Sequence, residues 1–256
     1  MKNTRLLLIV GTLLVSLQSC FAVDPPKSTA APISHDAWNI LLKKNVTDKG
    51  VVNYTAFKKD QVALRAYLDL LAANAPGDKW TKDEKLAYWI NAYNAFTVQL
   101  IVNNLDKKIK SIKDITAISI PLVSSPWDIK FIKIGDKTLD LNQIEHGIIR
   151  KQFDEPRIHF ALVCAAKSCP SLRNEAFIAT KLNAQLDDQA VLFLNDAFKN
   201  KISKTEINLS PLFNWYESDF TPKMPLIDWA KKYAKIKPEG SPKVNFMGYD
   251  WSLNGK

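Results

Sequence analysis

Hydrophobic side chains occupy nearly every side of the segment from residue 82 to residue 104, which predicts a helix buried at the centre of a domain. Thr81 and Glu84 have the spacing of a capping box at the start of this helix. Asn91 and Asn94 interrupt the apolar pattern and share one side of the helix, because they are three residues apart. A buried amide needs hydrogen-bond partners. We therefore expect these two amides to hold a neighbouring loop, and the alternative is that they face a pocket and bind substrate.

The rest of the chain combines helical spacing with a few short alternating segments. Helical periodicity predicts further helices over residues 35–44, 57–73, 141–152, 181–197 and 225–235, and a short one beginning at Pro211. Strands are predicted over residues 51–54, 130–134, 137–139, 158–164 and 205–209, with an extended segment over 244–251. This pattern predicts a helix-rich α+β fold with a small, mostly antiparallel sheet around the buried central helix.

The first 22 residues have the pattern of a secretory signal peptide. Lys2 and Arg5 precede an unbroken apolar run over residues 6–15, and small residues follow it. The run is too short to span a bilayer, which takes about 20 apolar residues. The sequence therefore predicts an exported protein that is either periplasmic or lipid-anchored in the cell envelope.

Two cleavage sites fit this signal, and the sequence leaves both open. Residues 17–20 resemble a lipobox, which would leave Cys20 as a lipidated N-terminus, whereas ordinary cleavage would follow Ala22. In either case residues 23–33 are expected to form a polar tether. Residues 34–256 are then enough for a single globular domain with its own core.

Charge narrows the choice of partners. The chain carries 35 Lys and Arg against 26 Asp and Glu, a net charge of +9, and removal of residues 1–22 takes away Lys2 and Arg5 and leaves +7. The lysines are scattered, and no dense basic run is interleaved with aromatic residues, so nucleic acid is not an expected partner. Contact with a membrane is expected only through the lipid anchor, and the oligomeric state is not predicted.

Candidate chemistry gathers between residues 157 and 170, which hold one of three histidines and two of three cysteines. On the predicted strand over residues 158–164, His159 and Cys164 would project from opposite faces. Cys169 lies in the loop that follows and could fold back toward His159. A neighbouring imidazole lowers the pKa of a thiol and makes it nucleophilic, so Cys169 and His159 are the predicted pair, with Glu145 orienting the imidazole.

Several longer motifs occur in an order and at a spacing that resemble one known family, the domains of unknown function numbered 547. The resemblance covers roughly residues 50–254, and its motifs are residues 89–95, 144–150, 157–162, 167–170 and 249–254. It implies a fold and a motif set but no reaction. A distant likeness to papain-like and transglutaminase-like enzymes is fold-level analogy, and it meets one departure. Those enzymes place the nucleophilic cysteine on the central helix, which has none here.

The sequence is compatible with two functions. The first is a cysteine-dependent hydrolase or transferase that acts on a small peptide or amide in the cell envelope. Its catalytic residues would be Cys169, His159 and Glu145, and its substrate-binding residues Asn91, Asn94, His146, Arg150 and Ser168. The second is a non-catalytic envelope binding or scaffold module in which Cys164 and Cys169 form a disulfide, as a cysteine pair in an oxidising compartment commonly does. The cysteine and histidine spacing is not typical of a zinc site, and we expect no metal or cofactor.

Overall fold

The central feature of the fold is the predicted helix, which is α4 (Lys82–Val102) in a computed structural model that describes residues 24–26, 28–115 and 125–255. The capping box is present: the Glu84 backbone N–H donates to Thr81 Oγ1 at 3.2 Å, and the Thr81 N–H donates to Glu84 Oε2 at 2.7 Å. Side chains on all sides of α4 are buried. The prediction of a buried central helix is confirmed. The predicted signal peptide and Cys20 lie outside the described residues.

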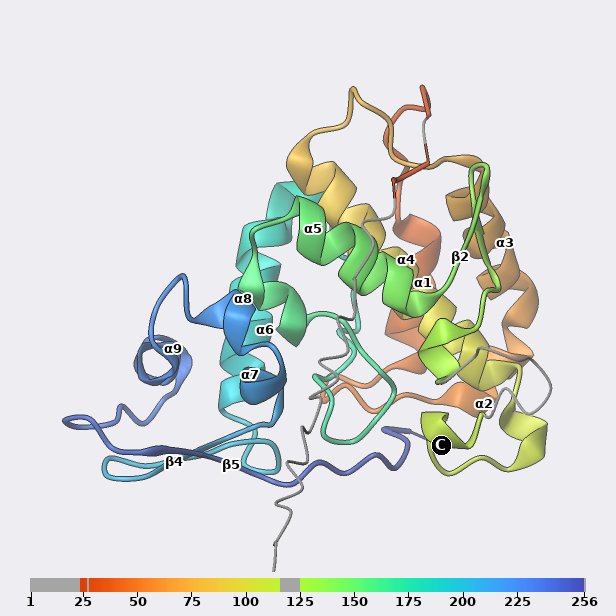
Figure 1. Cartoon of the computed structure of the whole chain (residues 1–256). Helices are drawn as coiled ribbons and strands as arrows, with labels where there is room; N and C mark the ends of the chain where they lie inside the picture. The colour runs from red at the N-terminus through yellow and green to blue at the C-terminus, as the bar shows by residue number, and fades with distance from the viewer. Residues whose placement is uncertain (1–23, 27, 116–124, 256) are drawn as a thin grey trace, which may run out of the picture.

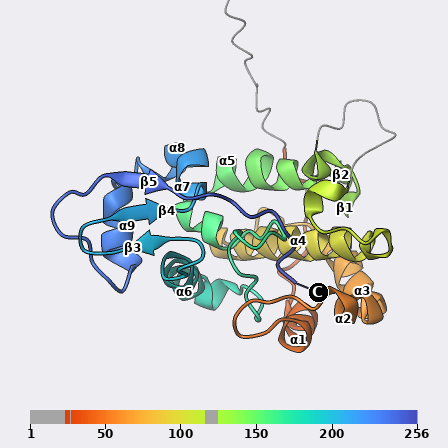
Figure 2. The ribbon, with the colours of Figure 1, turned by 90° about the horizontal axis from the view of Figure 1, so that it is seen from below.

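Helices and a hairpin surround α4 in the N-terminal half. Figure 2 shows α1 (Asp36–Asn45), α2 (Tyr54–Lys59) and α3 (Gln61–Ala73) on one side of it. On the other side lie the antiparallel hairpin β1 (Ile132–Ile134) and β2 (Lys137–Leu139), the π-helix η4 (Gln143–Ile149) and α5 (Arg150–Gln152). Short 3₁₀ turns connect these elements, namely η1 (Leu105–Lys107), η2 (Ile112–Asp114) and η3 (Pro126–Asp128).

The C-terminal half adds a second group of helices and a small sheet (Figure 1). The sheet has the order β3 (Lys201–Ile202), β4 (Ile207–Leu209) and β5 (Val244–Phe246), antiparallel between the first two strands and parallel between the last two. The helices are α6 (Leu182–Leu194), α7 (Leu212–Trp215), α8 (Glu217–Phe220) and α9 (Leu226–Tyr233), preceded by the 3₁₀ turns η5 (Pro156–Phe160) and η6 (Ala179–Lys181). Phe160 packs with Phe213, Phe220 and Trp229 in a second hydrophobic cluster. The α+β prediction is confirmed.

The predicted central strand over residues 158–164 is wrong. The chain forms the 3₁₀ helix η5 there, with Pro156 in its first turn and the Glu155 carboxylate accepting from the Arg157 N–H at 3.1 Å, and then continues without regular structure through Cys164. A short buried apolar run fits a buried helical turn as well as a strand, so periodicity could not separate them. His159 and Cys164 therefore do not lie on one strand, and the expectation that they project from opposite faces of it does not apply.

Two further boundaries differ from prediction. The helix predicted over residues 57–73 is divided into α2 and α3 at Asp60, whose carboxylate accepts from Lys44 at 2.7 Å and from Asn45 at 2.9 Å on α1. The strand predicted over residues 51–54 is reduced to bridges made by Val52. Both changes come from contacts between segments that are separate in the sequence.

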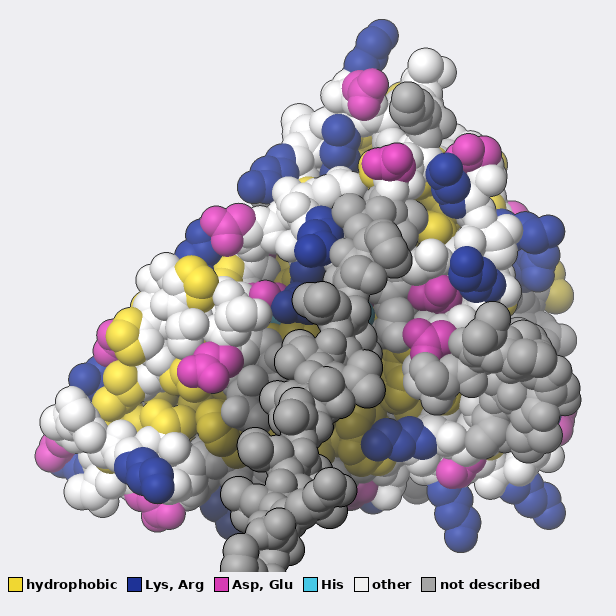
Figure 3. All heavy atoms as spheres, in the orientation of Figure 1, with side chains coloured by type: hydrophobic (Ala, Val, Ile, Leu, Met, Phe, Trp, Pro, Cys, Tyr) yellow, Lys and Arg dark blue, Asp and Glu magenta, His cyan; other side chains and the backbone are white. Residues whose placement is uncertain are grey.

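The predicted tether lies partly against the domain. The Trp80 indole N–H donates to the Ala30 carbonyl at 2.6 Å, and Pro26 is buried. Within the described residues no helix is both long and apolar enough to cross a bilayer. On the face shown in Figure 3, Lys and Arg are scattered among acidic side chains and are not gathered into one patch.

Candidate functional site: an aromatic cavity beside two thiols

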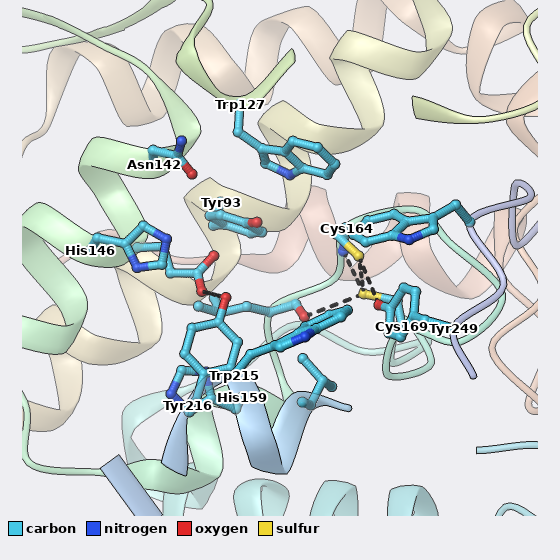
Figure 4. A pocket seen from close by; sticks show the side chains of 14 residues that line it. Tyr93, Trp127, Asn142, His146, His159, Cys164, Cys169, Trp215, Tyr216 and Tyr249 are labelled. Atoms are coloured by element: carbon cyan, nitrogen blue, oxygen red, sulfur yellow. Dashed lines mark hydrogen bonds between the residues drawn. The ribbon is translucent and has the colours of Figure 1, made fainter. Parts of the chain in front are cut away.

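The site is a cavity of about 210 Å³ between the two halves of the fold (Figure 4). Its walls come from α4, η3, η4, η5, the segment that carries both described cysteines, α7 and the C-terminal segment. Six of its fourteen lining residues are Tyr or Trp: Tyr93, Trp127, Trp215, Tyr216, Tyr249 and Trp251. Polar groups enter this wall at two places, one with the thiols and one with an acid–base network.

A tight turn brings the two thiols together. Ala165 has a φ of 62°, and the Cys169 N–H donates to the Ala166 carbonyl at 3.1 Å, so the chain reverses between the cysteines. Cys164 Sγ lies 2.7 Å from Cys169 Sγ, and both thiols are free. The Cys164 N–H also donates to Cys169 Sγ at 2.7 Å. Ser168 secures the turn to the C-terminal segment, because its hydroxyl accepts from the Asp250 N–H at 2.8 Å.

The environment distinguishes the two thiols. The hydrogen bond between the two thiols lowers the pKa of Cys164, and the contact with the Tyr249 hydroxyl at 3.3 Å lowers it further. Together these interactions outweigh the opposite effect of burial. Burial raises the pKa of Cys169 well above its usual range, and the neighbouring Cys164 raises it further. Cys164 is also partly exposed, whereas Cys169 is buried. The lowered pKa and the partial exposure both favour Cys164 over Cys169 as a nucleophile.

An acid–base network lies on the other side of the cavity, which Figure 4 shows with His146, His159 and Tyr216 opposite the cysteines. His159 Nε2 lies 2.7 Å from Asp219 Oδ2. Arg150 donates to both oxygens of Asp219, at 2.6 and 2.7 Å. Burial lowers the pKa of His159 despite the carboxylate, so the neutral ring donates through Nε2 to Asp219.

Asp219 is the charge that organises this network. Burial alone would raise its pKa, but the hydrogen bonds from His159 and Arg150 outweigh burial and hold the pKa well below its usual range. Glu145 belongs to a neighbouring contact, since it accepts from the Tyr216 hydroxyl at 2.7 Å. The His159 ring stacks on Tyr216 with 3.8 Å between centroids. The π-helix η4 places both Glu145 and His146 on the cavity wall. Short π-helical segments are frequent at functional sites.

The predicted pair of Cys169 and His159 is not hydrogen-bonded, although the structure describes both residues. His159 is bonded to Asp219, and the Cys169 sulfur lies against Cys164 and the Leu162 carbonyl. The group that orients His159 is thus Asp219, where the sequence had suggested Glu145. Asp219 follows His159 by 60 residues and carries no local signal of its role.

The predicted substrate-binding residues divide into two groups. Asn91 exchanges two hydrogen bonds with the backbone of Phe177, at 2.7 and 3.0 Å. Asn94 donates to the Ala161 carbonyl and accepts from the Val163 N–H, both at 2.9 Å. The loop-holding alternative is therefore the one observed for both asparagines.

Of the other three, only His146 lines the cavity. Arg150 is bonded to Asp219 and places Nη1 3.1 Å from His146 Nδ1, and the Ser168 hydroxyl bonds to the C-terminal segment. Tyr216, Tyr249 and Asp219 were missed by sequence reasoning. Among the residues that the structure describes, no group of three or more His, Cys, Asp or Glu side chains is arranged to hold a metal ion.

Fold and site together define an α+β domain with a reduced thiol pair on an aromatic cavity. The family described as "Protein of unknown function, DUF547" matches residues 77–194, and the chain resembles this family. The match contains α4, η4 and the thiol turn, together with all of the sequence motifs except the one over residues 249–254. No curated protein and no solved structure matches the chain.

Proposed function

We propose that the protein is an exported cysteine-dependent hydrolase or transferase that acts on a small peptide or amide in the cell envelope. The observation that carries the proposal is the partly exposed Cys164 thiol on the cavity wall, whose pKa is lowered by its hydrogen bonds with Cys169 and Tyr249. The sequence had favoured Cys169 as the nucleophile. Cys164 replaces it in the proposal because Cys169 is buried and its pKa is raised.

The reaction needs no cofactor. The Cys164 thiolate attacks the carbonyl carbon and forms a C–S bond, the C–N bond breaks, and the amine leaves with a proton. Water or a second amine then attacks the thioester and regenerates the thiol. Tyr249, whose hydroxyl lies 3.3 Å from the sulfur, is placed to share protons with it. His159, held by Asp219, is the acid–base group across the cavity.

The second candidate is a non-catalytic envelope binding or scaffold module with a Cys164–Cys169 disulfide. It is favoured by the 2.7 Å between the two sulfurs, because little movement would bring them to bonding distance. Bridge formation transfers two electrons and two protons to an oxidant of the export compartment. It would also remove the proposed nucleophile.

Two measurements on the mature protein isolated from its own compartment test these candidates. Thiols are counted by alkylation of denatured protein with and without reductant, and native protein is treated with a small acyl thioester and analysed by peptide mass spectrometry. The enzyme predicts two free thiols and an acyl adduct on Cys164 that water or an added amine discharges, with no adduct in Cys164→Ala. An isolated protein without free thiols, or a native Cys164 that is not acylated, would contradict the proposed enzymatic function and favour the non-catalytic module.

A further inference from the structure

We infer that the cavity binds a small organic ammonium group, and that a substrate or ligand of this site carries such a group. Six aromatic side chains line the cavity, and the face of an aromatic ring attracts a cation. Tyr93, Trp215 and Tyr249 reach it from α4, α7 and the C-terminal segment, so a bound group would meet rings from several directions. Aromatic enclosure of this kind is the arrangement that recognises alkylammonium ions.

Glu145 is the acidic side chain on the cavity wall. Asp219 lies behind His159 and is not part of the wall, and Arg150 donates to both of its oxygens. His159 is neutral, because burial lowers its pKa. His146 places Nδ1 3.1 Å from Arg150 Nη1. Glu145 forms no ion pair within the part of the chain that the structure describes, and its hydrogen bond comes from the uncharged Tyr216 hydroxyl.

The rings of this site already attract cations from the protein itself. Lys113, which is not part of the cavity wall, places Nζ 3.6 Å from the ring centroid of Trp251. The guanidinium carbon of Arg150 lies 5.1 Å from the ring centroid of Tyr216. Both distances are within the ~6 Å range of a cation–π contact. The cavity walls are therefore electrostatically suited to a cationic guest.

Size limits that guest to a head group. The cavity has about 210 Å³, below the roughly 300–1,000 Å³ of pockets that take drug-sized ligands. A purely apolar occupant would leave Glu145 facing it without compensation, and burying an unpaired acid is unfavourable. An ammonium group satisfies both the aromatic faces and the carboxylate. In the proposed enzyme the substrate would carry this ammonium group in addition to its uncharged amide nitrogen, so the substrate assignment rests on the proposed function, whereas binding itself does not.

The test compares probes of similar shape and different charge. Choline, ethanolamine and the uncharged 3,3-dimethylbutan-1-ol are titrated into the mature protein by calorimetry, in reducing buffer and again with Cys164→Ala, which cannot form a thioester. We expect at least one ammonium probe to bind about tenfold or more tightly than the neutral alcohol in both proteins. Glu145→Gln, which keeps an acceptor for Tyr216, should weaken ammonium binding about tenfold, and Glu217→Gln at an exposed position should leave it unchanged.

Two results would overturn the inference: equal affinity for choline and its neutral counterpart, or no binding of either ammonium probe at the highest concentrations that calorimetry allows. Comparison of probes on unmodified protein keeps the test decisive even where a variant fails to fold. Ammonium binding without any acylation of Cys164 would contradict the proposed reaction alone. Acylation of Cys164 without preference for the ammonium probes would contradict the cation site alone.

Discussion

Replacement of Asn94 by alanine should destabilise the fold strongly, because this one amide connects α4 to the segment that leads into Cys164. The Asn94 side chain is 2% exposed, donates to the Ala161 carbonyl and accepts from the Val163 N–H. Truncation leaves both backbone groups without these partners inside the core. Each unsatisfied buried group costs about 1–3 kcal/mol, so loss of both partners should lower the free energy of unfolding by about 2–6 kcal/mol.

The control is Asn74→Ala, which removes one solvent-exposed hydrogen bond of 2.9 Å to the Leu70 carbonyl at the end of α3. We expect it to cost about 1 kcal/mol or less, because water replaces the lost partner. Urea unfolding followed by tryptophan fluorescence measures both changes at constant m value. If Asn94→Ala shifts the free energy of unfolding no more than the control does, the amide does not hold the loop, and the substrate-binding alternative regains support.

Three further outcomes follow from the charges. Asp219→Asn should cost about 2–3 kcal/mol at neutral pH, below the 3–5 kcal/mol of a fully buried pair because Asp219 and Arg150 are each about a quarter exposed. The pKa of Asp219 is lowered in the fold, so this cost should shrink as the pH falls below about 4, and equal costs at pH 7 and pH 3 in urea titrations would contradict it. The alkylation rate of Cys164 should reach half its maximum at a pH below about 8.5, which is the pKa of a free cysteine. Tyr249→Phe should raise this midpoint, because it removes the hydroxyl that contacts the sulfur. A midpoint at or above that of a model thiol would refute the lowered pKa. Burial lowers the pKa of His35 from 6.5 to about 4, so the unfolded state binds a proton at a higher pH than the folded state does. The free energy of unfolding should therefore fall by up to about 3 kcal/mol as the pH is lowered from 6.5 to about 4. His35→Gln should remove this part of the pH dependence, and identical slopes for variant and wild type would show that His35 does not cause it.

Local sequence signals predicted correctly those elements whose start or turn depends on neighbouring residues. The capping box of Thr81 and Glu84 fixed the start of α4, and Gly135, with a φ of 57°, permitted the turn of the β1–β2 hairpin. Elements that depend on distant partners were misjudged. One predicted helix is divided at Asp60, whose carboxylate bonds to Lys44 and Asn45 on α1. No periodicity along residues 57–73 contains that information.

The same limit applies to the site. His146 and both described cysteines were identified from rarity and motif, and they do line one cavity. Their actual partners could not be found this way: Asp219 and Tyr249 lie in other segments, and only the folded chain brings them to His159 and Cys164. The choice between the two thiols depends on burial and on donors from these distant residues.

The two asparagines of α4 allow stabilisation of the fold to be distinguished from positioning of the Cys164 thiol. Asn91 makes the same two-bond contact as Asn94, but with Phe177, 13 residues after Cys164, whereas Asn94 holds Val163, the residue just before it. Asn91→Ala should therefore lower the free energy of unfolding by a similar ~2–6 kcal/mol yet leave the alkylation rate of native Cys164 unchanged. Asn94→Ala should alter that rate as well, because the backbone that carries the thiol loses its anchor.

The contrast has a structural meaning for the central helix. Because α4 has no cysteine, its contribution to a thiol reaction would be to position the Cys164 backbone through Asn94. Alkylation rates of both variants, measured in buffer without urea where each remains folded by far-UV circular dichroism, decide the point. Equal alkylation rates in the two variants would mean that the turn around Ala165 holds the thiols without help from α4, and the central helix would then be a core element only.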